Sequence, residues 1–211
     1  MIVNAASGIP GSLAPGEIFS LFGLGMGANV FVNGVPAPVL YASSGQVNAV
    51  LPYEAGSTGT ARLTVESGGL STTEWGVPLA PAAPAIFTRD ATGTGAGAVL
   101  NQDSTVNALE NPAARGSVVQ IFGTGQGITL PPSLTGAIST GPGNPAVLPV
   151  KVTIGGVDAK VQYQGAAPGL IAGAFQVNAV VPPDVTPGDA VPVQISVGGT
   201  ASQPGVTIAI R

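Results

Sequence analysis

The strongest constraint on the fold is a phrase that occurs twice, as QVNAVLP at residues 46–52 and as QVNAVVP at residues 176–182. Two further pairs of segments match in the same order along the chain: 18–27 with 118–127, and 30–41 with 152–163. Ordered matches spread over 211 residues indicate an internal duplication. The distance between matching positions grows along the chain, so the second copy carries an insertion of about 22 residues, which we place near 128–149.

The repeated phrase has the pattern of a short β-strand. Apolar and polar residues alternate in it, which is the period of a strand with one buried face. The two expected faces are Val47, Ala49 and Leu51 on one side and Gln46, Asn48 and Val50 on the other. Pro52 and Pro182 follow the two copies, and each should end its ladder because proline has no backbone N–H.

Turn residues separate the other expected strands. Asn33-Gly34 in the first copy and Gly155-Gly156 in the second suit a two-residue hairpin turn in which both residues have positive φ. Gly-Gly turns are also expected at 68–69 and 198–199. Glycine and proline interrupt every segment that could otherwise form a helix.

These patterns predict an all-β chain of two tandem β-sandwiches, each with about seven short strands. We expect the first sandwich to span residues 1–87 and the second to span residues 88–211, with the insertion near 128–149 inside the second. The proline-rich segment 79–88 favours an extended connection between them.

The composition excludes several classes of function. The chain has no cysteine and no histidine, which excludes thiolate catalysis, histidine-dependent triads and Cys/His metal sites. Its six basic and ten acidic residues are scattered, so neither a nucleic-acid footprint nor a polybasic membrane segment is present. No apolar run approaches the roughly 18 residues of a membrane span, and the first residues lack the features of a secretory signal. We therefore expect no catalytic residues, no cofactor, no metal, no nucleic-acid partner and no membrane insertion.

The ten carboxylates fall mainly in expected turns and strand ends, which favours solvated acids. A hydrolase would need two of them to converge in a cleft. No D-x-D-x-D-G calcium loop occurs, so at most a weak calcium site near Asp184 and Asp189 stays open.

Two glycine-rich loops follow matching strands of the two copies. A dinucleotide-binding loop needs G-x-G-x-x-G at the start of a helix, whereas these loops have G-x-G-x-G and no helix after them. They are therefore interpreted as structural turns whose glycines allow positive φ. The glycines are Gly23, Gly25 and Gly27 in the first copy and Gly123, Gly125 and Gly127 in the second.

The polar residues of the repeated strand are Gln46 and Asn48 in the first copy and Gln176 and Asn178 in the second. Buried amides normally need hydrogen-bond partners, so we expect these side chains to bond the glycine loop of their own copy. The alternative is that they line a ligand groove. Their presence in both copies favours the structural role.

Two aromatic residues could contact a ligand. Trp75 has no counterpart in the second copy, and Tyr53 carries a hydroxyl on an aromatic ring, so a carbohydrate-binding surface is one hypothesis for them. The alternative is that Trp75 packs in the core or between the two units. Tyr41 and Tyr163 occupy matching positions, which favours a packing role for both.

A set of short motifs runs along the whole chain: VNAAS (3–7), APGE (14–17), PAIFT (84–88), NPAARG (111–116), FGTGQG (122–127), TIGG (153–156), YQGAAPG (163–169) and QVNAVVP (176–182). With these motifs the chain as a whole resembles a bacterial domain family found at the C-termini of large secreted proteins of soil bacteria. Each copy resembles the IPT/TIG group of immunoglobulin-like domains. The resemblance implies two immunoglobulin-like sandwiches with a non-enzymatic, extracellular accessory or adhesive role.

We therefore expect a non-enzymatic structural or interaction module, such as a spacer, an adhesion unit or a self-assembling unit of a surface or filament. A protein partner or self-association is expected, at an extracellular or cell-surface location. The second hypothesis is a carbohydrate-binding module with a polysaccharide ligand.

Overall fold

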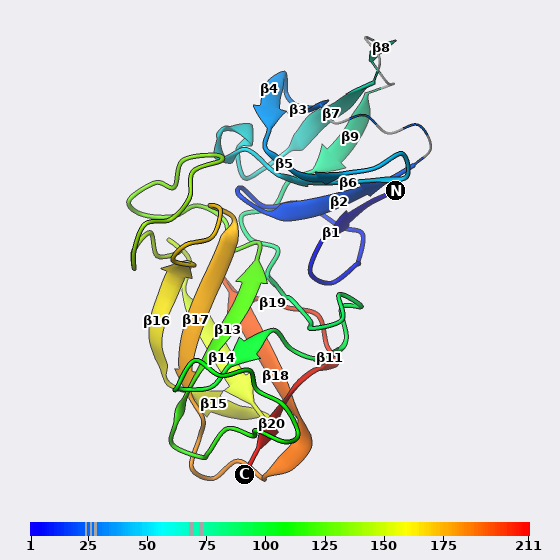
Figure 1. Ribbon diagram of the computed structural model, residues 1–211. Helices are drawn as coiled ribbons and strands as arrows, with labels where there is room; N and C mark the ends of the chain where they lie inside the picture. The colour runs from blue at the N-terminus through cyan, green and yellow to red at the C-terminus, as the bar shows by residue number, and fades with distance from the viewer. Residues whose placement is uncertain (24, 26, 28, 68–69, 72–73) are drawn as a thin grey trace.

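The computed structural model describes residues 1–23, 25, 27, 29–67, 70–71 and 74–211, and Figure 1 shows its two stacked groups of strands. Within these ranges the chain forms strands, turns and one short 3-10 helix, η1 (Tyr53–Ala55), and no α-helix. The prediction of an all-β fold is confirmed. No helix in the part of the chain that is described is long and apolar enough to cross a membrane.

Two sheets come from the first third of the sequence, and we call them together the N-terminal lobe. One sheet has the order β1 (Ile2–Asn4), β2 (Ile18–Phe22), β6 (Gln46–Val50), β5 (Val39–Ala42). The other has the order β4 (Val35–Ala37), β3 (Asn29–Val32), β7 (Thr60–Ser67), β8 (Leu70–Ser71), with β9 (Trp75–Pro78) also paired to β7.

The remaining strands form two more sheets, the C-terminal lobe. One has the order β10 (Ala85–Ile86), β13 (Val118–Thr124), β17 (Ala174–Val180), β16 (Val161–Ala166), with β12 (Val99–Leu100) also on β13. The other has the order β11 (Gly95–Ala96), β20 (Val206–Ile210), β18 (Gly188–Val197), β14 (Val150–Ile154), β15 (Val157–Ala159), with β19 (Thr200–Ala201) also on β18. The β11–β20 pair is parallel, and the other paired strands are antiparallel.

The change from one lobe to the other falls slightly earlier than expected. Leu79 still bridges Leu13 of the N-terminal lobe, whereas Ala85 already pairs with Thr124 of β13. The segment 85–86 therefore pairs with the C-terminal sheets, although the expected boundary at 87/88 assigned it to the first unit.

Each lobe closes around an apolar core shared by its two sheets, which makes the fold sandwich-like. In the N-terminal lobe, Phe19 and Val47 of one sheet pack in the same buried cluster as Val32 and Leu63 of the other. The C-terminal lobe has a larger cluster of the same kind.

The repeated phrase forms β6 and β17, the central strands of their sheets. Val47, Ala49 and Leu51 are fully buried as predicted, and the matching residues of the second copy, Val177, Ala179 and Val181, are buried too. The partners are also equivalent: Asn48 lies opposite Ser20 and Tyr41, and Asn178 lies opposite Gln120 and Tyr163. The neighbouring strand has a register shift just before each tyrosine.

Three of the expected hairpin turns have the required backbone conformation. The φ angles are 52° and 79° at Asn33-Gly34, 60° and 79° at Gly155-Gly156, and 58° and 88° at Gly198-Gly199. The expected turn at 68–69 lies outside the described residues.

The two lobes are packed against each other through a separate apolar cluster. It contains the buried residues Ile18 and Val50 of the N-terminal lobe and Ala167 and Ala174 of the C-terminal lobe. Val50 was expected on the polar face of its strand, and it is buried because the other lobe covers that end of the sheet.

The insertion near 128–149 also contacts the N-terminal lobe. The Thr135 hydroxyl accepts a hydrogen bond from the backbone N–H of Tyr53 at 3.0 Å and donates one to Oε2 of Glu54 at 2.7 Å. The insertion therefore links the two lobes, and it leaves the apolar side chains of Leu130 and Leu134 exposed.

Candidate functional site

An open groove lies at one edge of the N-terminal lobe, between the edges of its two sheets. It has a volume of about 430 Å³. One sheet contributes β1 and β2, and the other contributes β9. The residues that matter for its chemistry are Ile2, Leu21, Phe22, Trp75, Gly76 and Val77. No side chain that lines the groove is ionisable, so its chemistry is mainly apolar, with backbone polar groups and the amino group of Met1, which donates a hydrogen bond to the Phe22 carbonyl at 2.7 Å.

Trp75 lies where the apolar core of the lobe meets the groove. It pairs with Leu63 on β7, and antiparallel partners share a face of the sheet. Leu63 is fully buried and Val77, two residues further along β9, is buried as well, whereas Trp75 remains 38% exposed. Trp75 is therefore neither a core residue nor an interlobe residue, and part of its indole is accessible in the groove.

The free edge of β9 supplies the polar part of the groove. The Pro78 carbonyl points away from β7, because it accepts a hydrogen bond from the Leu13 N–H at 2.9 Å. Backbone groups alternate sides along a strand, so the N–H and C=O of Gly76 point to that same side. In the ranges described, no strand pairs with β9 there over Trp75–Val77.

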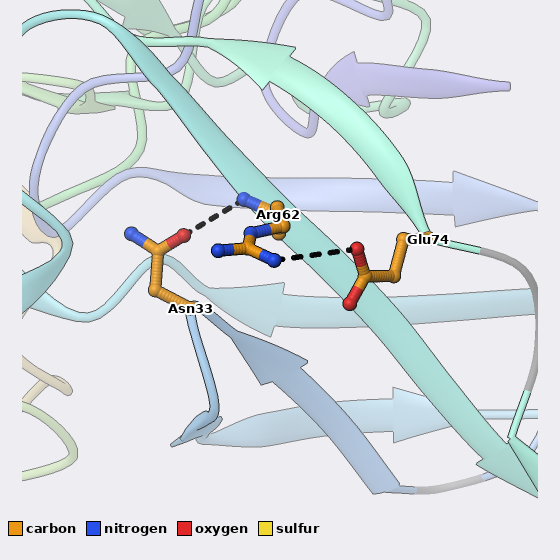
Figure 2. A network of polar contacts seen from close by, with 3 residues as sticks. All are labelled: Asn33, Arg62 and Glu74. Carbon is orange, nitrogen blue, oxygen red and sulfur yellow. Dashed lines mark hydrogen bonds and ion pairs between the residues drawn. The ribbon is translucent and has the colours of Figure 1, made fainter.

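The other face of the same sheet carries the polar network of Figure 2, in which Arg62 lies between Asn33 and Glu74. The Asn33 side chain accepts a hydrogen bond from the Arg62 N–H at 2.8 Å. The Arg62–Glu74 ion pair is 3.8 Å long between side chains that are 73% and 58% exposed. Such exposed pairs contribute little to stability.

Tyr53 does not share a site with Trp75. Its backbone contacts the insertion, and its ring packs so closely on Gly16 that a Cβ there would collide with it. Its hydroxyl is buried, and burial raises the pKa of Tyr53. The structure therefore assigns Tyr53 to the contact between the lobes and separates it from the expected ligand surface.

The side-chain amides of the repeated strand form a hydrogen bond with each other within each copy. Nε2 of Gln46 donates to Oδ1 of Asn48 at 2.8 Å, and Gln176 donates to Asn178 at the same distance. In the C-terminal lobe, where strand and loop are both fully described, no hydrogen bond joins Asn178 to the glycine loop. The expected bond is therefore wrong there: the asparagine oxygen accepts from the glutamine of its own strand, and the loop is not its partner.

The glycine loop of the C-terminal lobe carries the segment that connects the lobes. A Cβ added at its glycines would collide with backbone carbonyls of that segment: Gly123 with Ala85, Gly125 with Ala83, and Gly127 with Pro81. Gly125 and Gly127 have φ of 84° and 78°, but Gly123 is not in the positive-φ region. Close backbone approach therefore explains this loop more completely than turn conformation does.

In the first copy, Gly25 has a φ of 65°, and a Cβ on Gly27 would collide with the carbonyl of Glu66. Gly23 lines the groove.

One carboxylate differs from the expectation of solvated acids. Glu17 is fully buried, and burial raises its pKa to about 8 against the opposing hydrogen bond from Ala14. Its Oε2 accepts from the Ala14 N–H at 2.8 Å, whereas Oε1 has no partner in the described structure. The second copy has Ser117 in the matching turn, hydrogen-bonded to the Ala114 carbonyl, which could have indicated a turn-closing role for Glu17.

Among the residues that are described, no group of three or more Asp or Glu side chains could hold a metal ion. Asp184 and Asp189, near which the sequence left at most a weak calcium site open, belong to no such group.

Comparison with known proteins adds little to this geometry. No protein-family model matches the chain, and no curated protein matches it either. A crystal structure of a surface glycan-binding protein from Prevotella bryantii aligns with 12% identity and a TM-score of 0.33. The alignment covers 96% of this chain and 39% of that chain, so the present chain spans well under half of that protein.

Proposed function

We propose that this chain is a non-enzymatic extracellular interaction module, built from two tandem immunoglobulin-like sandwiches of the IPT/TIG kind, that binds a protein partner through the groove of its N-terminal lobe. The observation that carries the proposal is the groove itself: a mainly apolar groove with a volume of about 430 Å³, a partly exposed tryptophan and an unpaired strand edge. Partly exposed aromatic side chains in apolar pockets are typical centres of protein interfaces.

The equivalent pairing of the two lobes supports an internal duplication. The strand that contains Asn48 and the strand that contains Asn178 have partners in the same register, with a tyrosine opposite each asparagine. A duplicated sandwich with an edge groove in one copy has the form of a binding unit attached to a supporting unit.

The close packing of the lobes supports a role as a stiff spacer. Ile18 and Val50 are buried against Ala167 and Ala174, and Thr135 ties the insertion to the other lobe. A module of this kind would hold its groove in a fixed orientation at the cell surface, the location that the sequence resemblance implies.

The proposal is tested with the intrinsic fluorescence of the chain, since Trp75 is the only tryptophan. The full chain is titrated with displayed peptides, and its self-association is followed by sedimentation velocity over a wide concentration range. We expect ligands that shift the emission of Trp75 and that bind Phe22→Asp, a change at an exposed side chain of the groove, much more weakly. The matched control Arg62→Ala, on the other face of the sheet, should bind as the native chain does. The proposal fails if no peptide binds and the chain stays monomeric at every concentration.

The second candidate is carbohydrate binding at the same groove, which is favoured by the accessible indole of Trp75. An aromatic ring at a surface can stack on the apolar face of a sugar. A glycan array and a titration with soluble polysaccharides test it. Binding that is lost in Trp75→Ala, without any peptide binding, would replace the first proposal with this one.

A further inference from the structure

The edge strand of the N-terminal lobe has an equivalent in the C-terminal lobe. β9 pairs with β7, and β20 pairs with β18 in the matching position. The carbonyl of Pro78 accepts from Leu13 at 2.9 Å, and the carbonyl of Ala209 accepts from Ala113 at 2.9 Å. Gly76 lies two residues before Pro78, and Thr207 lies two residues before Ala209, so Gly76 corresponds to Thr207.

In the C-terminal lobe this edge is occupied by a strand of the same chain. β11 runs parallel to β20, with Gly95 opposite Val206. The Gly95 N–H donates to the Gly205 carbonyl at 2.8 Å, and the Gly97 N–H donates to the Thr207 carbonyl at 2.9 Å. This extra strand covers Val206, which is fully buried.

In the N-terminal lobe the corresponding place is the groove. No described strand pairs with β9 at Gly76, and Trp75 is 38% exposed. The strand register makes Val206 the structural counterpart of Trp75, although no counterpart was expected from the sequence. The N-terminal lobe thus has the same open strand edge as the C-terminal lobe and an apolar side chain, Trp75, at the position of Val206. It lacks a strand equivalent to β11. Exposed edges of this kind bind extended peptides by adding a strand, with main-chain hydrogen bonds for affinity and apolar contacts for specificity.

We propose that the groove binds an extended segment of a protein partner, rich in small uncharged residues, which adds to β9 as a parallel strand. The inference rests on the proposed function of the groove and names the chemistry of its partner. The carbonyls of Glu74 and Gly76 accept from the segment, and the Gly76 N–H donates to it, as the equivalent positions of β20 predict.

Small residues are expected in the segment because, in the C-terminal lobe, the equivalent segment of β11 lies close to the side chain of Val206. A Cβ on Gly97 would lie 3.1 Å from Cγ1 of Val206, and the larger Trp75 leaves less room still. The side chains that line the groove carry no charge, so they offer no partner to a charged side chain of the segment, which favours uncharged residues. A second copy of this chain is a poor donor, since its own Gly95–Gly97 segment is already paired with β20.

The probe for the test is a capped synthetic peptide with the sequence of residues 92–99, TGTGAGAV, which contains the strand that occupies the equivalent edge. It is titrated into the full chain while the fluorescence of Trp75 is recorded. Saturable binding is expected. N-methylation of the peptide at Gly95 or Gly97 should weaken binding by about tenfold, since each change removes one main-chain hydrogen bond and adds a steric clash. N-methylation at Ala96, whose N–H faces away from the edge, is the matched control and should leave the affinity within about twofold.

A second test uses the protein. Gly76→Pro removes the proposed donor from an edge strand, where proline is tolerated, and it should abolish peptide binding. Gly76→Ala keeps the N–H and should still bind. The N-methylated peptides decide the question on the native chain if the proline variant does not fold.

The outcomes separate this inference from the function on which it rests. Equal weakening by all three N-methylations, or none by any, overturns strand addition. Polysaccharide binding or self-association that shifts the Trp75 emission and is unchanged in Gly76→Pro would keep the groove as a binding site but contradict the peptide partner. If no ligand of any class changes the emission of Trp75, the proposed function itself fails.

Discussion

At the scale of single residues, Glu17 is the clearest departure from what its sequence context suggests. The motif A-P-G-E has the appearance of an exposed turn, yet the other elements bury the carboxyl completely. Its backbone N–H donates to the Ala14 carbonyl at 2.9 Å, and its side chain accepts from the Ala14 N–H at 2.8 Å. The side chain thus closes a turn at the start of β2, beside the contact between the lobes.

The burial of Glu17 predicts a stability that falls as the pH rises. The pKa of this carboxyl is raised from 4.5 to about 8 on folding, so between these values the folded chain keeps a proton that the unfolded chain has lost. The contribution of the protonated Glu17 carboxyl to the stability of the fold is fully present below pH 4.5. It then decreases with a slope of at most about 1.4 kcal/mol per pH unit as the pH approaches the folded pKa.

Urea titrations of the native chain and of Glu17→Gln at several pH values between 5 and 8 measure this slope, and the variant should show a much flatter profile. Glu74→Gln, at an exposed carboxylate, is the control and should keep the native slope. Parallel profiles for the native chain and Glu17→Gln would contradict the assignment. The pKa values of Asp90 and Asp103 are lowered by hydrogen bonds from Thr92 and Thr105. These two carboxylates therefore make the chain less stable as the pH falls, and they do so at pH values below this range.

At the scale of elements, the glycine loop of the C-terminal lobe and the proline-rich segment that follows the N-terminal lobe form one packed unit. The Ala83 N–H donates to the Gly125 carbonyl at 2.9 Å, and the absence of side chains on the loop lets the two backbones meet. The loop therefore holds the connection in place, which explains why glycine recurs at every second position.

Gly125→Ala should destabilise the chain by about 2–4 kcal/mol, because a left-handed conformation and a backbone collision both oppose the added methyl group. Gly141→Ala is the matched control, since nothing lies within 4 Å of a Cβ there, and it should change stability by less than about 0.5 kcal/mol. Chemical denaturation followed by circular dichroism measures both. Equal stabilities of the two variants would show that the loop does not hold the connection.

Strands were predictable from the sequence because their causes are local. Alternation and the following proline were enough to place the buried face of residues 46–52 and the end of the strand. The burial of Val50 was not predictable, because the surface that covers it comes from residues more than a hundred positions away. For the same reason Trp75 and Tyr53 could be grouped as aromatics but not separated into a groove residue and an interlobe residue.

At the scale of the whole molecule, the two lobes share buried polar contacts as well as an apolar cluster. The Thr124 hydroxyl accepts from the Ile18 N–H at 2.8 Å and donates to the Gly173 carbonyl at 2.8 Å, and Thr124 is fully buried. Its hydroxyl connects Ile18 of the N-terminal lobe to Gly173, the residue just before β17, in the C-terminal lobe. We expect this contact to make the unfolding of one lobe depend on the other.

Thr124→Val should remove this coupling at nearly constant volume and leave the Ile18 N–H without a partner, at a cost of about 2–3 kcal/mol. The fluorescence of Trp75 reports on the N-terminal lobe alone, whereas circular dichroism reports on both lobes. In guanidinium titrations the two signals should coincide for the native chain and separate for Thr124→Val. Thr140→Val, at an exposed threonine, should behave as the native chain does; separate transitions in the native chain would contradict the coupling.

The central claim is that the groove of the N-terminal lobe receives a peptide strand at Gly76, and amide hydrogen exchange at that residue tests it most directly. In the free chain the Gly76 amide, on an open strand edge, should exchange rapidly. With a saturating amount of the 92–99 peptide it should become protected, whereas the exchange of an exposed amide such as that of Gly141 should stay unchanged. Continued rapid exchange at Gly76 while the peptide is bound would contradict the claim.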